Sequence, residues 1–151
     1  MAVALGANLG DRQGQLHRAV EALRRLLDDV SVSSFHDTAP VGVALPHPNY
    51  LNAAVTGLTR LSPGALLSHL LEIERALGRT RPHINAPRTI DLDLILYGDM
   101  IVEEPALILP HPRFRDRQFV LAPLAEIAPA MVDPLTGLTV EFLLRRLTRS
   151  P

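Results

Sequence analysis

The stretch Pro87-Arg88-Thr89-Ile90-Asp91-Leu92-Asp93-Leu94-Ile95-Leu96-Tyr97 decides how this chain is interpreted. Apolar residues recur at every second position from Ile90 to Leu96, which predicts a β-strand with one buried face. The same alternation places Asp91 and Asp93 together on the other face, about 7 Å apart along the strand. Two carboxylates on one face repel each other and lose hydration, so we expect a cation to compensate them.

Magnesium is the natural cation for this pair, because Mg²⁺ prefers oxygen ligands and commonly binds together with substrate phosphates. Arginines, whose guanidinium forks match phosphate oxygens, flank the strand on both sides. They are Arg79, Arg81, Arg88, Arg113, Arg115 and Arg117. Carboxylates for metal and arginines for phosphate together indicate phosphoryl-group transfer. The alternative interpretation is an exposed strand face whose aspartates form salt bridges with surface arginines.

Composition narrows the chemistry further. The 151 residues suffice for a single domain, 1–151, with its own core. A formal net charge of −1 gives no basic field, so a nucleic-acid partner is not expected. The absence of cysteine excludes disulfides, thiolate metal sites and cysteine nucleophiles. All 15 basic residues are arginine, which excludes a P-loop lysine and a Schiff-base lysine.

The beginning of the chain carries no targeting signal that we can recognise. Met1 leads into Ala2-Val3-Ala4-Leu5 without a charged segment or a long apolar run. We therefore expect a cytoplasmic protein with neither a signal peptide nor a membrane span.

Hydrophobic periodicity predicts the element order β-α-β-β-α-β, followed by extra C-terminal elements. The predicted strands are 3–5, 30–35, 50–59 and 87–97, with a short return strand at 100–102; the predicted helices are 12–27, 63–77, 119–127 and 140–147. We expect an α+β fold, a ferredoxin-like α/β sandwich with helices on one face of a largely antiparallel sheet. The other face would be free for the aspartates, beside two irregular segments, 37–49 and 79–87, of which the first is long enough to be a binding loop.

Three further polar residues stand out. Asn52 lies among apolar strand residues and needs hydrogen-bond partners if it is buried, for structure or for function. Glu74 lies near the end of its helix, where the macrodipole disfavours it, and a salt bridge to Arg79 or Arg81 would explain it structurally. His111 is held between two prolines, and alone it is more typical of a surface loop.

Five motifs occur in a fixed order along the chain. They are Gly6-Ala7-Asn8-Leu9-Gly10-Asp11, Tyr50-Leu51-Asn52-Ala53, Ile73-Glu74 with Leu77-Gly78-Arg79-Thr80-Arg81, Pro87-Arg88-Thr89-Ile90-Asp91-Leu92-Asp93, and Pro110-His111-Pro112-Arg113 with Arg117-Gln118-Phe119-Val120-Leu121. From Val3 to about Ala130 the chain resembles the 6-hydroxymethyl-7,8-dihydropterin pyrophosphokinase family. The blocks at 88–93 and 110–113 are highly specific, whereas the glycine-containing loop alone would be a weak signal.

The resemblance implies transfer of pyrophosphate from ATP to the hydroxymethyl group of a dihydropterin, giving AMP and the pterin diphosphate in folate biosynthesis. It implies that Asp91 and Asp93 hold two Mg²⁺ ions that bridge the ATP phosphates. The catalytic residues implied are Arg79, Arg88, Asp91, Asp93 and Arg117. The implied nucleotide contacts are Leu67, Glu74, Arg79, Arg81, Arg88, His111 and Arg117. The implied pterin slot consists of Thr38, Ala39, Val41, Tyr50, Asn52 and Phe119, with Asn52 bonding the ring edge and Phe119 stacking on its face.

The chain departs from the family pattern at three places. Family members often carry a tryptophan before the Gly-Pro-Arg, but Asn85-Ala86-Pro87-Arg88 stands here and the chain has no tryptophan. Ala106 and Pro112 replace the arginine and tyrosine of some relatives, which puts two nucleotide contacts in doubt.

Two alternative functions remain open from sequence. One is a non-catalytic binding module without a metal requirement; the other is a metal-dependent phosphohydrolase, against which the pterin-slot residues argue. The expected partners are the small molecules ATP and 6-hydroxymethyl-7,8-dihydropterin, with no membrane, and the protein is expected to be a monomer or a weak dimer.

Overall fold

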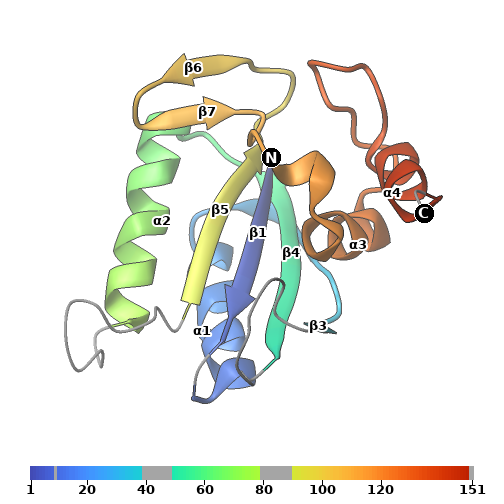
Figure 1. Ribbon diagram of the computed structural model, residues 1–151. Coiled ribbons are helices and arrows are strands. Elements are labelled where there is room, and N and C mark those ends of the chain that lie inside the picture. The colour runs from blue at the N-terminus through green and yellow to red at the C-terminus, as the bar shows by residue number, and fades with distance from the viewer. Residues whose placement is uncertain (9, 39–48, 79–89, 150–151) are drawn as a thin grey trace.

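Antiparallel pairing around the first strand builds a five-stranded sheet (Figure 1). The computed structural model describes residues 1–8, 10–38, 49–78 and 90–149. The strands of the sheet are β1 (Ala2–Ala7), β2 (Asp28–Val32), β3 (His36–Thr38), β4 (Tyr50–Leu58) and β5 (Ile90–Leu96). Their order is β2-β4-β1-β5, and β3 also pairs with β4. The sheet therefore has β1 at its centre and β5 at one edge.

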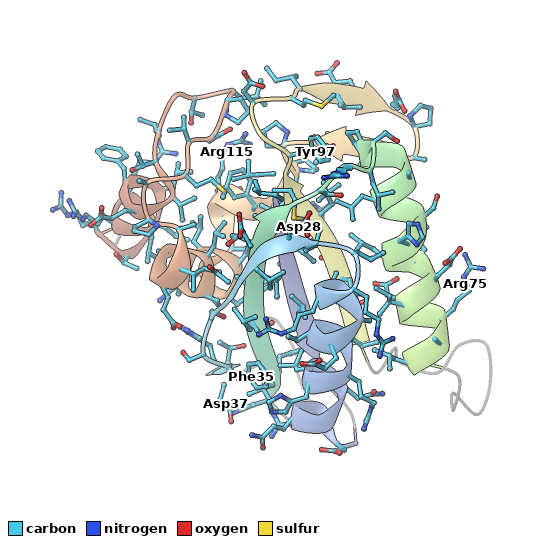
Figure 2. All side chains as sticks on the ribbon, turned by 180° about the vertical axis from the view of Figure 1, so that it is seen from behind. Asp28, Phe35, Asp37, Arg75, Tyr97 and Arg115 are labelled. Atoms are coloured by element: carbon cyan, nitrogen blue, oxygen red, sulfur yellow. The ribbon has the colours of Figure 1, made fainter. Side chains whose placement is uncertain are left out.

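Two helices cover the first face of this sheet. The helices α1 (Arg12–Arg24) and α2 (Pro63–Leu77) bury leucines against side chains of β1, β4 and β5 that include Val3, Val55 and Leu92. Figure 2 views the molecule from this side. The mixed α and β character expected from the sequence is confirmed, as is the antiparallel sheet.

Side chains stabilise the ends of both helices. The Asp11 carboxylate accepts a hydrogen bond from the Gly14 N–H at 3.0 Å, which caps α1. The Ser62 hydroxyl accepts one from the Ala65 N–H at 3.2 Å, and Pro63 occupies the first helical position as predicted. The Gln15 amide donates to the carbonyl of Leu77, the last residue of α2, at 3.0 Å. α1 thereby fixes the end of α2.

The second face is not free along its whole length, and the expectation of helices on one face only is wrong. The helices α3 (Gln118–Ile127) and α4 (Val140–Arg149) pack on it, together with the short 3₁₀ helix η1 (Phe114–Asp116). The residues of β1 and β4 beneath them are small, Ala2, Ala4 and Ala54, whereas β5 contributes the larger Ile95 and Leu96. Because alanine side chains are small, residues of α3 can approach the sheet backbone closely. A second hydrophobic core therefore forms between α3 and this face of the sheet.

Several boundaries also differ from the prediction. β1 extends to Ala7, and α1 ends at Arg24 rather than at residue 27. The strand predicted at 30–35 is split into β2 and β3 around Ser33, whose hydroxyl accepts the Ala54 N–H at 2.9 Å. The return strand begins at Val102: β6 (Val102–Glu104) pairs with β7 (Leu107–Leu109), and within the part of the chain that the structure describes the two form a separate two-stranded sheet. Within the described residues no helix combines the length and apolar character that a membrane crossing requires.

A buried ion pair joins η1 to the loop before α4. Asp133 has no exposed surface, and its carboxylate accepts hydrogen bonds from Arg115 Nε at 2.5 Å and from a second Arg115 nitrogen at 2.9 Å. Burial would raise the pKa of Asp133, but the bonds from Arg115, Thr136 and the Leu135 N–H outweigh it and lower the pKa. The pair therefore stays charged and fixes the segment that leads into α3.

We expect Asp133→Ala to lower the free energy of unfolding by about 3 kcal/mol, because it leaves Arg115 unpaired in a partly buried place. Glu141→Ala is the matched control: it breaks the exposed Glu141–Arg145 pair of α4 and should cost less than about 0.5 kcal/mol. Urea denaturation of both variants measures the difference. Equal losses in the two variants would contradict this role of Asp133.

Candidate functional site

The second face of the sheet is hollowed where α3 begins. A cavity of ≈ 290 Å³ lies there, over β1, β4 and β5. Its lining residues are Ala4, Leu5, Gly6, Thr38, Tyr50, Asn52, Asp91, Asp93, Arg117, Phe119 and Val120. Seven of the residues predicted from sequence meet here, although they come from four separate segments of the chain.

Glycine forms the floor of the cavity at its centre. Strand pairing places Gly6 opposite Asn52 on one side and opposite Asp91 on the other. A Cβ atom at Gly6 would lie 3.2 Å from the Asn52 side-chain oxygen. The missing side chain keeps space open between the amide and the carboxylate. Sequence reasoning assigned Gly6 only to a weak motif, although a glycine inside a strand does signal a close approach.

The aspartate pair lies as the alternation of β5 predicts. Ile90, Leu92 and Leu94 are buried in the first core, while Asp91 and Asp93 are half-buried and line the cavity. The alternation ends before Leu96, which was expected on the same face but is buried in the second core together with Ile95. The predicted juxtaposition of the two carboxylates on one face is therefore present in the structure.

Glu74 contacts the same strand from its open edge. Its carboxylate oxygen accepts a hydrogen bond from the Leu92 N–H at 2.7 Å. Leu92 lies between Asp91 and Asp93, so Glu74 fixes the backbone from which both carboxylates project. Its suggested partners Arg79 and Arg81 lie outside the described residues.

Asn52 is 5 % exposed, and its amide is oriented by a neighbour. The Asn52 amide nitrogen donates to the Thr38 hydroxyl, across the pairing of β3 with β4. The side-chain oxygen is then on the side of Gly6, at the cavity floor. A polar amide held in this way can recognise the hydrogen-bonding edge of a ligand.

An arginine and an aromatic ring form the opposite wall. Arg117 is the N-cap residue of α3, and its guanidinium lies over the Phe119 ring at 5.6 Å from the centroid. Phe119 is 36 % exposed, which is unusual for a large aromatic residue beside a core. An aromatic face at a cavity mouth is suited to stacking on a flat ligand.

His111 lies close enough to the site to respond to its charges. Burial lowers the pKa of His111; the Asp93 charge opposes this, while Arg117 and Arg113 add to it. The Arg113 N–H donates to His111 Nδ1 at 3.2 Å. The ring is therefore neutral at pH 7 with its proton on Nε2, which leaves a hydrogen-bond donor.

Two further predicted site residues that the structure describes, Leu67 and Glu74, do not line the cavity. Leu67 packs at the border of the first core, and Glu74 binds the edge of β5. Ala39, Val41, Arg79, Arg81 and Arg88 lie outside the described residues, so their roles stay predictions. The sequence also did not single out Ala4, Leu5 or Val120, whose apolar character shows no functional signal.

Comparisons with known proteins agree on one family. The family model described as 7,8-dihydro-6-hydroxymethylpterin-pyrophosphokinase (HPPK) matches residues 2–129. A 2-amino-4-hydroxy-6-hydroxymethyldihydropteridine pyrophosphokinase of Synechocystis sp. is 44% identical over 147 residues, which cover 95% of this chain and 74% of that protein. The protein of the same name from Bacillus subtilis is 46% identical over 137 residues, 89% of this chain and 81% of its own.

Solved structures share the fold at much lower identity. The wild-type HPPK-DHPS of Plasmodium falciparum crystallised with SDX-DHP has a TM-score of 0.71 and 14% identity, covering 96% of this chain and 43% of that chain. An HPPK-DHPS in complex with substrates has a TM-score of 0.71 at 12% identity. The chain spans less than half the length of these solved chains, and the likeness to them shows the fold alone.

We expect Asp93→Asn to lower the pKa of His111 further in the metal-free protein, because it removes the charge that raises it. Proton NMR titration of the His111 ring, assigned with a His111→Gln variant, measures this. Asp99→Asn, whose charge is not among those acting on His111, should leave the value unchanged. A His111 pKa above 6.5 in the wild type, or a rise in Asp93→Asn, would contradict the assignment.

Proposed function

Because the chain belongs to the 7,8-dihydro-6-hydroxymethylpterin-pyrophosphokinase family, we propose that it transfers pyrophosphate from ATP to the hydroxymethyl group of 6-hydroxymethyl-7,8-dihydropterin. The products are AMP and the pterin diphosphate, in folate biosynthesis. One observation carries the proposal to this chain's own residues. A single cavity joins the carboxylate pair and Arg117 to the buried amide of Asn52 and the exposed ring of Phe119.

The fold fits a ferredoxin-like sandwich with additions. The path β1-α1-β2-β4-α2-β5 gives the order β2-β4-β1-β5, with α1 and α2 on one face. We assign β3, the β6–β7 hairpin, α3 and α4 as additions to that core, and two of them, β3 and α3, supply walls of the cavity.

The pterin end of the cavity is suited to bind a flat ring with polar groups along its edge. Phe119 offers an aromatic face for stacking, and Asn52, oriented by Thr38, offers a fixed hydrogen-bonding group to the ring edge. Leaving a buried amide without its partner is costly, so this arrangement discriminates against rings that lack the matching groups.

The nucleotide end has the donor set of a magnesium site. Among the described residues no group of three or more acidic or histidine side chains could hold a metal alone. Mg²⁺ takes only one or two protein carboxylates and completes its shell with waters and substrate phosphates, so the pair Asp91 and Asp93 fits it. We propose that these residues hold two Mg²⁺ ions, which when bound neutralise charge on the ATP phosphates.

The chain's own residues then contribute binding and orientation. Arg117 can donate to phosphate oxygens with two parallel N–H groups, and neutral His111 can donate from Nε2. The pterin hydroxymethyl oxygen attacks the β-phosphorus of ATP in line and releases its proton to solvent, the bond from the β-phosphorus to the oxygen shared with the α-phosphate breaks, and AMP leaves with that oxygen. We assign no covalent role to a side chain, so catalysis rests on position and charge.

Analysis of the products by ³¹P NMR tests the proposal. MgATP and 6-hydroxymethyl-7,8-dihydropterin should yield AMP and pterin diphosphate in equal amounts. Release of inorganic phosphate or pyrophosphate without a pterin product would instead indicate a phosphohydrolase. Saturable pterin binding without any turnover would indicate a binding module.

We expect Asp93→Asn to lower kcat about a hundredfold or more, which corresponds to roughly 3 kcal/mol of lost charge neutralisation. Asp91→Asn should behave in the same way. Both substitutions are nearly isosteric, so far-UV circular dichroism and pterin binding without nucleotide should be retained. Asp99→Asn, in the exposed turn after β5, serves as the control, and wild-type turnover in either β5 variant would refute the metal role.

We expect Arg117→Lys to lower kcat/KM by about tenfold, because an ammonium cannot donate two parallel bonds to a phosphate. Thermal stability should barely change, since the positive charge is kept. Arg113→Lys is the matched control: it is an exposed arginine four residues away that does not line the cavity. Full activity of Arg117→Lys would show that positive charge alone suffices at this position.

A further inference from the structure

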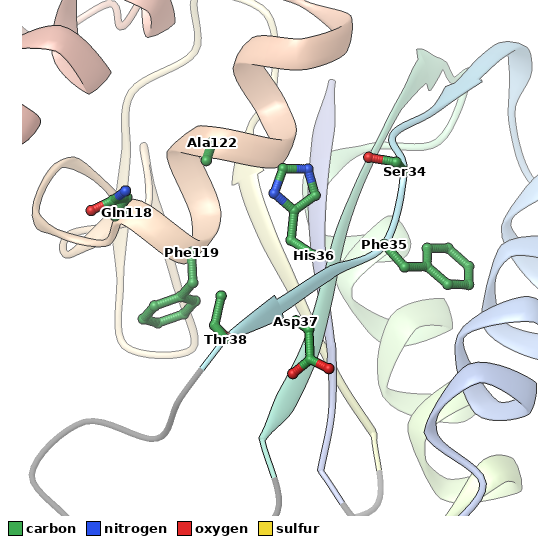
Figure 3. Close-up of a pocket in the computed structure, with 8 residues that line it drawn as sticks. All are labelled: Ser34, Phe35, His36, Asp37, Thr38, Gln118, Phe119 and Ala122. Carbon is green, nitrogen blue, oxygen red and sulfur yellow. The ribbon is translucent and has the colours of Figure 1, made fainter.

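A second cavity adjoins the pterin slot and shares a wall with it. This cavity, of ≈ 580 Å³, lies between β3 and α3, and both Thr38 and Phe119 line it as well as the slot. Figure 3 shows Phe119 of α3 beside Thr38 of β3, with Ala122 and His36 facing the same space. Because the described side chains line this space without filling it, close packing among them does not fix the separation of the two elements here.

Hydrogen bonds fix that separation at the far end of the cavity. The Glu126 carboxylate accepts from the Ser34 N–H at 2.5 Å and from the Ser34 hydroxyl at 2.6 Å, and it lies 3.0 Å from His36 Nε2. We call these three residues the Glu126 clasp. The Ser34 hydroxyl and N–H, followed by His36, lower the pKa of Glu126 to about 2. Both carboxylate oxygens are thus charged acceptors at neutral pH.

On α3 and on β3 alike, the residue of the clasp and the residue of the pterin slot lie on the same face of the element. Positions 119, 122 and 126 follow one face of a helix, so Phe119 and Glu126 point to the same side of α3. Positions 36 and 38 lie on one face of a strand, so His36 and Thr38 point to the same side of β3. Each element therefore carries one slot residue and one clasp residue, with the cavity between them.

We propose that Glu126 is a positioning residue of the pterin slot: through Ser34 and His36 it sets the distance between Phe119 and the Thr38–Asn52 wall. The inference rests on the proposed function, since it concerns the fit of the pterin ring. A slot for a flat ring depends on the spacing of its walls, and small displacements of positioning groups can be costly. Glu126 is 39% exposed, and exposed ion pairs contribute little to global stability, so the clasp acts on spacing.

Steady-state kinetics of Glu126→Ala test the proposal. The KM for the dihydropterin should rise about tenfold, while the KM for ATP stays within about twofold of the wild type and the thermal midpoint barely moves. Glu126→Gln keeps one acceptor oxygen for Ser34, so its KM for the dihydropterin should lie between the values of the wild type and of Glu126→Ala. Glu141→Ala, an exposed helical glutamate paired with Arg145, is the control and should leave both constants unchanged.

The partner residues give an independent arm of the test. Ser34→Ala removes one of the three contacts and should raise the pterin KM by a smaller factor, and combined with Glu126→Ala it should add nothing further. These milder variants carry the test if Glu126→Ala does not fold. An unchanged pterin KM in the Glu126 and Ser34 variants, or an equal rise for pterin and ATP, would overturn the inference. Failure of the wild type to form pterin diphosphate would instead overturn the proposed function.

Discussion

The pleat of β5 is the constraint on which the site depends. Its Leu92 and Leu94 are buried in the core that α1 and α2 cover, and burial of one such side chain is worth about 1.5–3 kcal/mol. A slip of one residue would expose these leucines and bury Asp91 and Asp93 in an apolar core, so the register is strongly specified. The Glu74 carboxylate adds a bond to the Leu92 N–H at the open edge of the strand. The core thus determines where two negative charges lie.

The second face of the sheet is divided by the size of its side chains. Along β1, Ala2 lies under the helical cover, Ala4 lies at the border of the cover and the cavity, and Gly6 lies under the cavity. Alanine lets α3 approach the sheet, and glycine leaves room for a ligand between Asn52 and Asp91. The buried Arg115–Asp133 pair holds the segment just before α3, so the N-terminal turn of that helix places Arg117 and Phe119 at the edge of the opening. Packing, rather than any single motif, brings the two halves of the site together.

Short-range signals made much of this predictable from sequence. The alternation of apolar residues in β5 predicted that the two aspartates share a face. Ser62 and Pro63 predicted the start of α2, and the family motifs indicated the residues of the slot. Periodicity could not show where α3 and α4 pack, because an amphipathic helix reveals that it has an apolar face but not which surface it covers. The contact between Ser34 and Glu126 spans 92 positions, and no local pattern marks such a pair. Glu74 was correctly singled out as unusual, but its Leu92 N–H partner is a backbone group, which sequence reasoning cannot see.

In the proposed function, one cavity joins a magnesium–phosphate end on Asp91 and Asp93 to a pterin end on Asn52 and Phe119. A crystal structure with Mn²⁺ in place of Mg²⁺, a non-hydrolysable ATP analogue and 6-hydroxymethylpterin tests it most directly. We expect anomalous manganese peaks between the two carboxylates and the phosphates, with the pterin ring on Phe119 and its edge at Asn52. Manganese bound away from Asp91 and Asp93, or a pterin bound outside the slot, would contradict it.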